Sequence, residues 1–97
     1  MIESLTFIKT NHFIHRQKER FIPNTLLIAL QRRIKRAKKT TAVIISRQLL
    51  LNYGIRKNME LFLIVNDQVF ITGYYQDVTE YFLQEKKHLA FQLINKT

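Results

Sequence analysis

The clearest helical pattern in the chain follows Pro23, its only proline. Proline suits the first turn of a helix, and Asn24 or Thr25 has a side chain that can cap one. Over 24–39, apolar residues recur at spacings of three and four, which predicts a single buried stripe on an amphipathic helix. This stripe consists of Leu27, Leu30, Ile34 and Ala37. The rest of the helix surface is polar and strongly basic.

The pattern then changes to a strand followed by a short helix. Residues 41–45 are β-branched except for one alanine, which predicts a strand. Ser46 is a favourable cap for a helix over 47–53. Gly54 stands where such a helix ends in the left-handed conformation.

Two β-prone runs come next. Residues 60–65 and 68–72 are rich in apolar and β-branched residues. The pair Asn66 and Asp67 between them favours a tight turn. We therefore expect a β-hairpin that ends near Gly73.

The first 22 residues are the least regular part of the chain. Their apolar residues interrupt polar ones without a sustained period, and a strand near 5–9 is the only element the pattern suggests. The polar run from Arg16 to Arg20 is typical of a solvated surface. We expect residues 1–22 to form a poorly defined arm.

The C-terminal extension, residues 77–95, begins like a helix. Asp77 and Glu80 stand at the spacing of a capping box, which predicts a helix that runs to about Lys87. In residues 89–94, Leu, Phe and Leu alternate with Ala, Gln and Ile. Both a strand and a continued helix fit this pattern, and the strand is favoured.

Length and composition place these elements in one domain. Ninety-seven residues suit a single small domain, and 46% hydrophobic residues argue against disorder. The expected class is a small α+β domain, 1–97, with a β-hairpin core, a basic amphipathic helix and a C-terminal helix. A domain of this size buries only about 60–65% of its unfolded surface, so pairing with a second copy would stabilise it.

Composition also excludes several classes of site. There are no cysteines, which removes disulfides and cysteine-ligated zinc. Two glycines leave no room for a glycine-rich phosphate loop. His12 and His15 lack a third ligand, so we expect neither a metal nor another cofactor. No apolar run near the N-terminus approaches the roughly 20 residues that span a bilayer, which favours a cytoplasmic protein.

Charge is the strongest functional signal. The formal net charge is +9, and it is unevenly distributed. Residues 1–59 hold 13 basic and two acidic residues, whereas residues 60–97 hold three basic and five acidic ones. This asymmetry predicts a surface for a polyanion. Nucleic acid is the commonest such partner, although an acidic protein or an anionic membrane fits the charge equally well.

The run from Gln31 to Lys39 is the main candidate site. It holds six cations within eight residues and no acid, whereas mixed signs would serve solubility better. Such side chains neutralise phosphates and release counterions. Its cations are Arg32, Arg33, Lys35, Arg36, Lys38 and Lys39. Membrane binding would need a wide apolar face, and this stripe is narrow.

Further candidates lie outside this run. Arg16, Lys18 and Arg20 either extend the basic patch or belong to the arm. Tyr74 and Tyr75 have rings on which bases can stack, but aromatic pairs at such positions are more often part of a core.

Residues 42–72 show an order of predicted elements that is also found in a known protein family. They read AVIISRQLLLNYGIRKNMELFLIVNDQVFIT, or strand, short helix, Gly-Ile, polar turn and hairpin. This segment resembles the AbrB/MazE/SpoVT swapped-hairpin family, and its SymE-like branch in particular. The matching positions are Ile45, Leu49, Tyr53, Gly54, Ile55, Leu61, Leu63, Val69 and Ile71. Ser46 replaces the usual proline, and Asn58 with Met59 replaces the usual Gly-Asp.

The resemblance implies a homodimer with interlaced hairpins that binds DNA in preference to RNA. By the same resemblance, Arg47, Arg56 and Lys57 are second-rank nucleic-acid contacts. The implied role is that of a transcriptional regulator or a toxin–antitoxin component. SymE-like proteins have been proposed to act on RNA, which leaves an RNA-targeting toxin as one alternative. A non-catalytic interaction subunit of a larger assembly is the other. No base–nucleophile pair is apparent, so we assign no catalytic residue and expect no enzyme.

Overall fold

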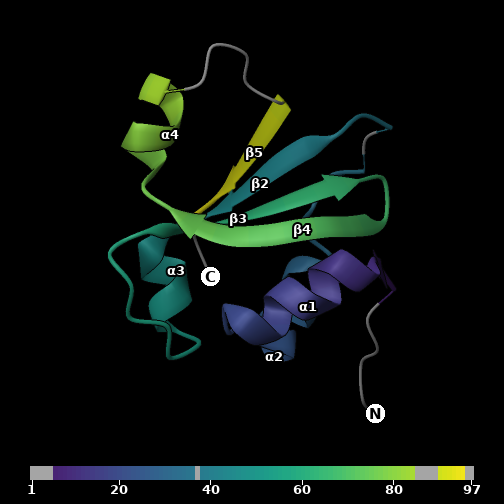
Figure 1. The fold of residues 1–97 in the computed structure, drawn as a ribbon, viewed down its shortest axis with the longest axis horizontal. Helices are drawn as coiled ribbons and strands as arrows, with labels where there is room; N and C mark the ends of the chain where they lie inside the picture. The colour runs from purple at the N-terminus through teal and green to yellow at the C-terminus, as the bar shows by residue number, and fades with distance from the viewer. Residues whose placement is uncertain (1–5, 37, 85–89, 96–97) are drawn as a thin grey trace.

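A five-stranded mixed sheet forms the centre of the molecule (Figure 1). The computed structural model describes residues 6–36, 38–84 and 90–95. Strand order is β1-β4-β3-β2-β5, with antiparallel pairing in the middle and parallel pairing at both edges. The elements are β1 (Ile8–Lys9), α1 (Asn11–Glu19), α2 (Asn24–Leu30), β2 (Thr41–Ile45), α3 (Arg47–Leu51), β3 (Glu60–Asn66), β4 (Val69–Gln76), α4 (Val78–Gln84) and β5 (Ala90–Ile94). The expected α+β class is confirmed.

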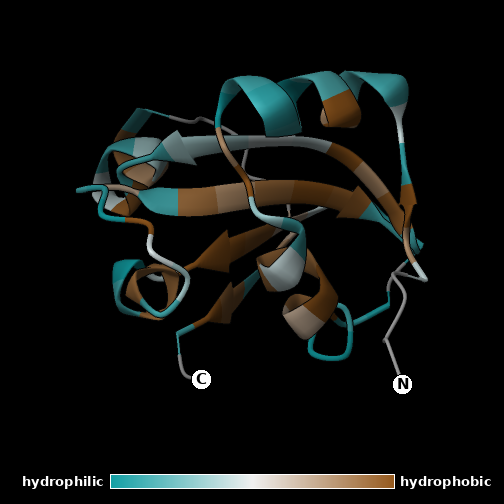
Figure 2. Cartoon of the chain, turned by 90° about the horizontal axis from the view of Figure 1, so that it is seen from below, coloured by the Kyte–Doolittle hydropathy of each residue, from teal (hydrophilic) through white to brown (hydrophobic). Residues whose placement is uncertain are grey.

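Both faces of the sheet are apolar, and helices cover both. Helices α1, α2 and α3 lie on one side of the sheet, and α4 lies on the other (Figure 1). Alternation along β2 sends Val43 and Ile45 into the larger core, and Ala42 and Ile44 into the smaller one. Figure 2 shows the hydrophobic residues concentrated on the strands, whereas α1 is mostly hydrophilic. The central strands are therefore buried on both sides.

Residues 6–22 do not form the expected poorly defined arm, because they are docked on the sheet. Strand β1 pairs with the first two residues of β4, and Thr10 caps α1 by accepting a hydrogen bond from the Phe13 N–H. The Phe13 side chain is fully buried, and its ring stacks on Phe70 with centroids 5.0 Å apart. Helix α1 buries one side chain, that of Phe13, and Ile8 of β1 is exposed, so the sequence shows no apolar period here.

The basic helix is shorter than predicted. Helix α2 ends at Leu30, a turn follows, and Arg32 to Lys39 belong to the connection that leads to β2. Gln92 on β5 explains the break, because its Oε1 accepts from the Lys35 N–H (2.8 Å) and its Nε2 donates to the Arg33 carbonyl (2.6 Å). These backbone groups are thus bonded to β5. Repulsion among the neighbouring cations also disfavours a helix.

Other parts of the prediction for this region hold. The stripe residues Leu27, Leu30 and Ile34 are buried, whereas Ala37 lies outside the described residues. Neither expected cap is used, because Pro23 takes the N-cap position without a side-chain bond. The side-chain Oδ1 of Asn24 instead accepts from Lys9 Nζ at 2.6 Å.

The segment from β2 to α3 forms as its local signals indicate. Strand β2 has the expected bounds, and Ser46 Oγ caps α3 by accepting from the Leu49 N–H at 3.2 Å. Helix α3 ends at Leu51, two residues early, and Gly54 then adopts a φ of +77°. β2, β3, β4 and β5 pair with one another within one chain, and the interlaced dimer stays a prediction.

The hairpin of β3 and β4 differs from the predicted one in two details. Asn66 belongs to β3, and Asp67 adopts the positive φ of the turn, at +52°. Gly73 does not end the hairpin, because β4 continues to Gln76. A Cβ atom at Gly73 would lie 2.9 Å from Ile22 Cδ1 and 3.3 Å from Phe13 Cε1. Glycine is needed here for the close approach of the N-terminal segment.

The C-terminal extension is largely as expected. Asp77 Oδ1 accepts from the Glu80 N–H at 2.9 Å, which confirms the cap of α4. Helix α4 is described to Gln84, and its expected continuation to Lys87 lies outside the described residues. Residues 90–94 form β5, parallel to β2, which confirms the strand. Within the described ranges, no helix combines the length and the apolar character needed to cross a membrane.

Replacing Phe13 with Ala tests the docking of α1. Removal of a fully buried aromatic ring typically costs about 3–5 kcal/mol of unfolding free energy. The adjacent change Ile14→Ala affects a side chain that is 39% exposed, and we expect a loss of about 0.5 kcal/mol. Urea unfolding followed by circular dichroism measures both. Equal stability of the two variants would contradict the docking.

Candidate nucleic-acid interface

Arg47 is tied into an ionic cluster where α3, β3 and α4 begin. Its Nη2 lies 2.7 Å from Asp77 Oδ2, and its Nη1 donates to Asn58 Oδ1 at 2.7 Å. Its Nε lies 3.0 Å from Glu60 Oε2, an ion-pair contact without hydrogen-bond alignment. The Glu80 N–H and then the Arg47 guanidinium hold the pKa of Asp77 below its usual value. Two carboxylates thus already neutralise the charge of Arg47, so its first role is to hold these elements together.

The six first-rank candidates gather on one connection, residues 32–39, which we call the basic loop. All six side chains are exposed. Between Glu19 and Glu60, the sequence has ten Lys and Arg residues and no carboxylate. The basic loop therefore offers phosphates an exposed row of cations without a neighbouring acid along the chain.

The basic loop is anchored to the fold at several points. Ile34, at its middle, is buried, and the Gln92 side chain bonds the backbone on either side of it. Before the loop, Gln31 Oε1 accepts from the Thr6 N–H at 2.7 Å. After it, Thr41 Oγ1 donates to the Lys39 carbonyl at 3.1 Å. Its backbone is thus held at Arg33, Lys35 and Lys39, whereas its six basic side chains reach into solvent.

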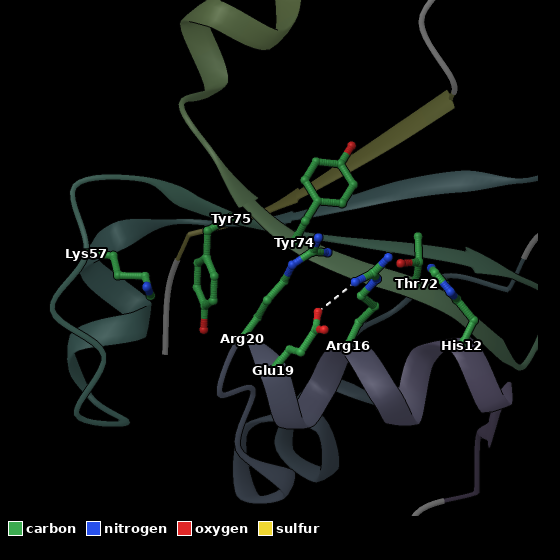
Figure 3. Close-up of a pocket in the computed structure, with 8 residues that line it drawn as sticks. All are labelled: His12, Arg16, Glu19, Arg20, Lys57, Thr72, Tyr74 and Tyr75. Atoms are coloured by element: carbon green, nitrogen blue, oxygen red, sulfur yellow. Dashed lines mark hydrogen bonds and ion pairs between the residues drawn. The ribbon is translucent and has the colours of Figure 1, made fainter.

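A second cationic surface lies between α1 and β4. His12 and Arg16 on α1 and Arg20 at its C-cap are spaced four apart and line the same hollow. They border an open hollow of about 640 Å³, which we call the α1–β4 groove (Figure 3). Its lining is completed by Glu19, Lys57, Thr72, Tyr74 and Tyr75.

Fixed contacts hold the cations of the α1–β4 groove. Arg20 Nη1 donates to the Gly73 carbonyl at 2.8 Å, on the edge of β4 that β1 leaves uncovered. Arg16 Nη1 lies 2.6 Å from Glu19 Oε1, and this pairing lowers the pKa of Glu19. Lys57 Nζ stands 4.7 Å from the centre of the Tyr75 ring, within the range of a cation–π contact. The groove thus has three permanent cations and one carboxylate.

Tyr75 closes one end of the α1–β4 groove. Its hydroxyl donates to the Phe21 carbonyl at 3.0 Å, which ties β4 to the turn after α1. Burial raises the pKa of Tyr75 to about 12. The side chain is therefore a neutral hydrogen-bond donor at physiological pH.

The structure separates residues that the sequence grouped together. Arg16 and Arg20 face the α1–β4 groove, whereas Lys18 borders a different hollow on the other side of α1. The groove follows β4, while the basic loop leads into β2, beyond β3. Of the second-rank candidates, Lys57 lines the groove, and Arg56 is exposed and does not line it.

Sequence reasoning missed the groove as a unit. The spacing of His12, Arg16 and Arg20 was a usable signal, but it required a helix in a segment expected to be irregular. Lys57 joins it only through the tertiary fold. His15 pairs with Glu19 at 3.2 Å, and in the part of the chain that the structure describes no three His, Asp or Glu side chains cluster to hold a metal.

Comparison with known proteins adds no relative. No family model matches the chain, and searches among curated proteins and solved structures find no significant similarity. The resemblance to the AbrB-like family therefore stays a prediction.

Replacing Asp77 with Asn tests the ionic cluster. The pKa of Asp77 is lower in the folded chain than its value of about 4 in the unfolded chain, so the carboxylate stabilises the fold above pH 4. This stabilisation is lost as the pH falls through the pKa of the folded chain. We therefore expect Asp77→Asn to melt earlier than wild type at neutral pH and to converge with it below about pH 4. Circular dichroism melts across pH measure this. Asp67→Asn, in the exposed turn, is the matched control, and a pH-independent deficit of Asp77→Asn would contradict the assignment.

Replacing Tyr75 with Phe tests the buried hydroxyl at alkaline pH. A phenol whose pKa rises from about 10 in the unfolded chain to about 12 in the folded one stabilises the fold below pH 10. This contribution is lost as pH rises from about 10 to 12. We expect Tyr75→Phe to be less stable than wild type at pH 7, with a gap that narrows over this window. Tyr53→Phe carries the same chemical change as a control, and a gap that widens would refute the account.

Proposed function

We propose that this protein binds nucleic acid and that the basic loop supplies its main contacts with phosphates. The observation that carries this proposal is the exposure of six cations on one anchored connection. Arg and Lys side chains in such a row displace the counterions condensed on a phosphate backbone. A fixed loop backbone lowers the entropy lost when those side chains bind.

The basic loop is suited to contact the backbone of a nucleic acid. Its described residues, 32–36 and 38–39, are irregular, so they present no recognition helix to a groove. Phosphate contacts position a protein on its polymer, whereas contacts with base edges supply specificity. We therefore expect affinity with little preference for sequence from the basic loop alone.

The biological role within this proposal follows from the resemblance. A DNA-binding regulator or a toxin–antitoxin component, acting as a homodimer in the cytoplasm, is the role that AbrB-like proteins imply. Arg56 and Lys57 remain secondary contacts in this scheme. Arg47 is the weakest of the proposed contacts, because Asp77 and Glu60 already neutralise it.

A salt titration of binding tests the proposal. We expect wild type to bind duplex DNA with a log–log salt slope of about −4 or steeper. Changing Lys35, Arg36, Lys38 and Lys39 to Gln removes four cations, which should flatten the slope by about 3 to 4 units. Fluorescence anisotropy with labelled duplex DNA, repeated with single-stranded RNA, measures both.

Single substitutions sharpen this test. Arg36→Gln and Lys18→Gln each remove one exposed cation, but only Arg36 belongs to the basic loop. We expect the slope to change by about 0.9 on duplex DNA for the first and to stay unchanged for the second. The proposal is wrong if neither polymer binds at low salt, which would favour an acidic protein partner. Equal losses in the two variants would show that only net charge matters.

A further inference from the structure

The α1–β4 groove is a second cationic surface, separate from the basic loop. Its cations come from α1 and from the segment after α3, so the tertiary fold brings them together. Arg16, Arg20 and Lys57 oppose Glu19 alone, which leaves the lining with a formal charge of +2. An open hollow with this excess of positive charge attracts an anion.

The spacing of the side-chain donors suits a chain of anions. His12 and Arg16 on α1 are followed by Arg20 at its C-cap, and each helical step of four residues advances about 6 Å. The side chains point from α1 toward β4 (Figure 3). A row of donors at this interval can follow successive phosphates of one extended strand.

Two tyrosines of β4 complete the lining from opposite faces of the strand, Tyr75 on the side of the larger core and Tyr74 on the side of the smaller one (Figure 3). Tyr74 is fixed by stacking on Phe62, with ring centroids 5.4 Å apart and planes inclined by 10°. Tyr75 is fixed by its bond to the Phe21 carbonyl. Rings next to cations are the usual elements of sites for single strands, where bases stack and phosphates pair with Arg and Lys. A hollow of about 640 Å³ has room for nucleotides, whereas a paired duplex does not expose its bases to such rings.

We propose that the α1–β4 groove is a binding site for single-stranded nucleic acid, in which Arg16, Arg20 and Lys57 contact phosphates beside Tyr74 and Tyr75. The class of ligand rests on the proposed function, but the residues do not overlap with the basic loop. Glu19 competes with the phosphate for Arg16, because phosphate binding replaces the Arg16–Glu19 ion pair with an Arg16–phosphate pair.

The test uses a labelled ten-nucleotide oligouridylate and matched variants. We expect Arg16→Gln with Lys57→Gln to weaken binding about tenfold and to flatten the salt slope by about 1.4, which is two contacts at 0.7 each. Lys18→Gln changes a cation on the opposite side of α1 and should stay within about twofold of wild type, a difference below roughly 0.4 kcal/mol. Arg20 is left unchanged in these variants because it also bonds the Gly73 carbonyl.

A substitution that should strengthen binding provides a second test, because a general loss of structure or charge would not produce tighter binding. Glu19→Gln removes the competing carboxylate, so we expect tighter binding of the oligouridylate by a few-fold. Lower affinity of Glu19→Gln, or equal losses in the Arg16/Lys57 and Lys18 variants, would overturn the site. Circular dichroism melts confirm that each variant is folded, and an unfolded double variant is replaced by Lys57→Gln alone.

The ligands distinguish the proposal from its rivals. Duplex DNA should be bound with little change by Arg16→Gln, which leaves the secondary contact Lys57 in place, and uridine monophosphate should bind far more weakly than the oligomer. Equal affinity for uridine monophosphate and for the oligomer would show that the groove binds a single nucleotide and not a strand. Competition by polyglutamate as effective as that by RNA would indicate an acidic protein. If the basic-loop variants bind normally and the groove variants do not, the groove is supported as a binding site and the proposed role of the loop is wrong. If the groove variants bind normally and the basic-loop variants do not, only the proposal for the groove is wrong.

Discussion

The contact of Phe13 with Phe70 is the one on which the rest of the structure depends. It holds α1 against β4 at the edge of the sheet that β1 covers only at Val69 and Phe70. Gly73 permits this approach because it has no side chain to meet Ile22 and Phe13. Once α1 is docked, Thr10 and Arg20 bond carbonyls of Ile71 and Gly73. An edge that would otherwise invite pairing with another chain is thereby protected.

The fold places the cations of the chain in three different settings. One set of cations is neutralised within the fold, as Arg47 is by Asp77 and Glu60. A second set lies on the basic loop, beyond β3 from the α1–β4 groove. The third set lines that groove with tyrosines as neighbours. A net charge alone does not distinguish these three situations, which differ in what surrounds each cation.

Signals that act over a few residues were sufficient for much of the fold. Ser46, Gly54 and Asp77 each adopt the role that their local chemistry indicates. The β-branched run of β2 forms the expected strand. These predictions succeed because a cap or a left-handed turn is decided by a side chain and the backbone beside it.

Features that depend on distant residues were not predictable in the same way. The end of α2 is set by Gln92, which lies 57 residues after Lys35. Gly73 serves a close approach of Ile22, although in the sequence it has the appearance of a strand terminator. The basic loop was identifiable because its cations are contiguous. The α1–β4 groove was not, because Arg16 and Lys57 come from separate segments and meet only after folding.

The most direct test of two separate cationic surfaces is a nuclear magnetic resonance titration with a short oligouridylate at low salt. The account predicts that amide resonances of α1 and of Thr72 to Tyr75 shift together, at lower ligand concentration than those of the basic loop. It also predicts that β5 and α4 resonances stay in place, apart from Gln92, which contacts the loop. Shifts confined to α4 and β5, or shifts of the basic loop and the α1–β4 groove along one shared binding curve, would contradict it.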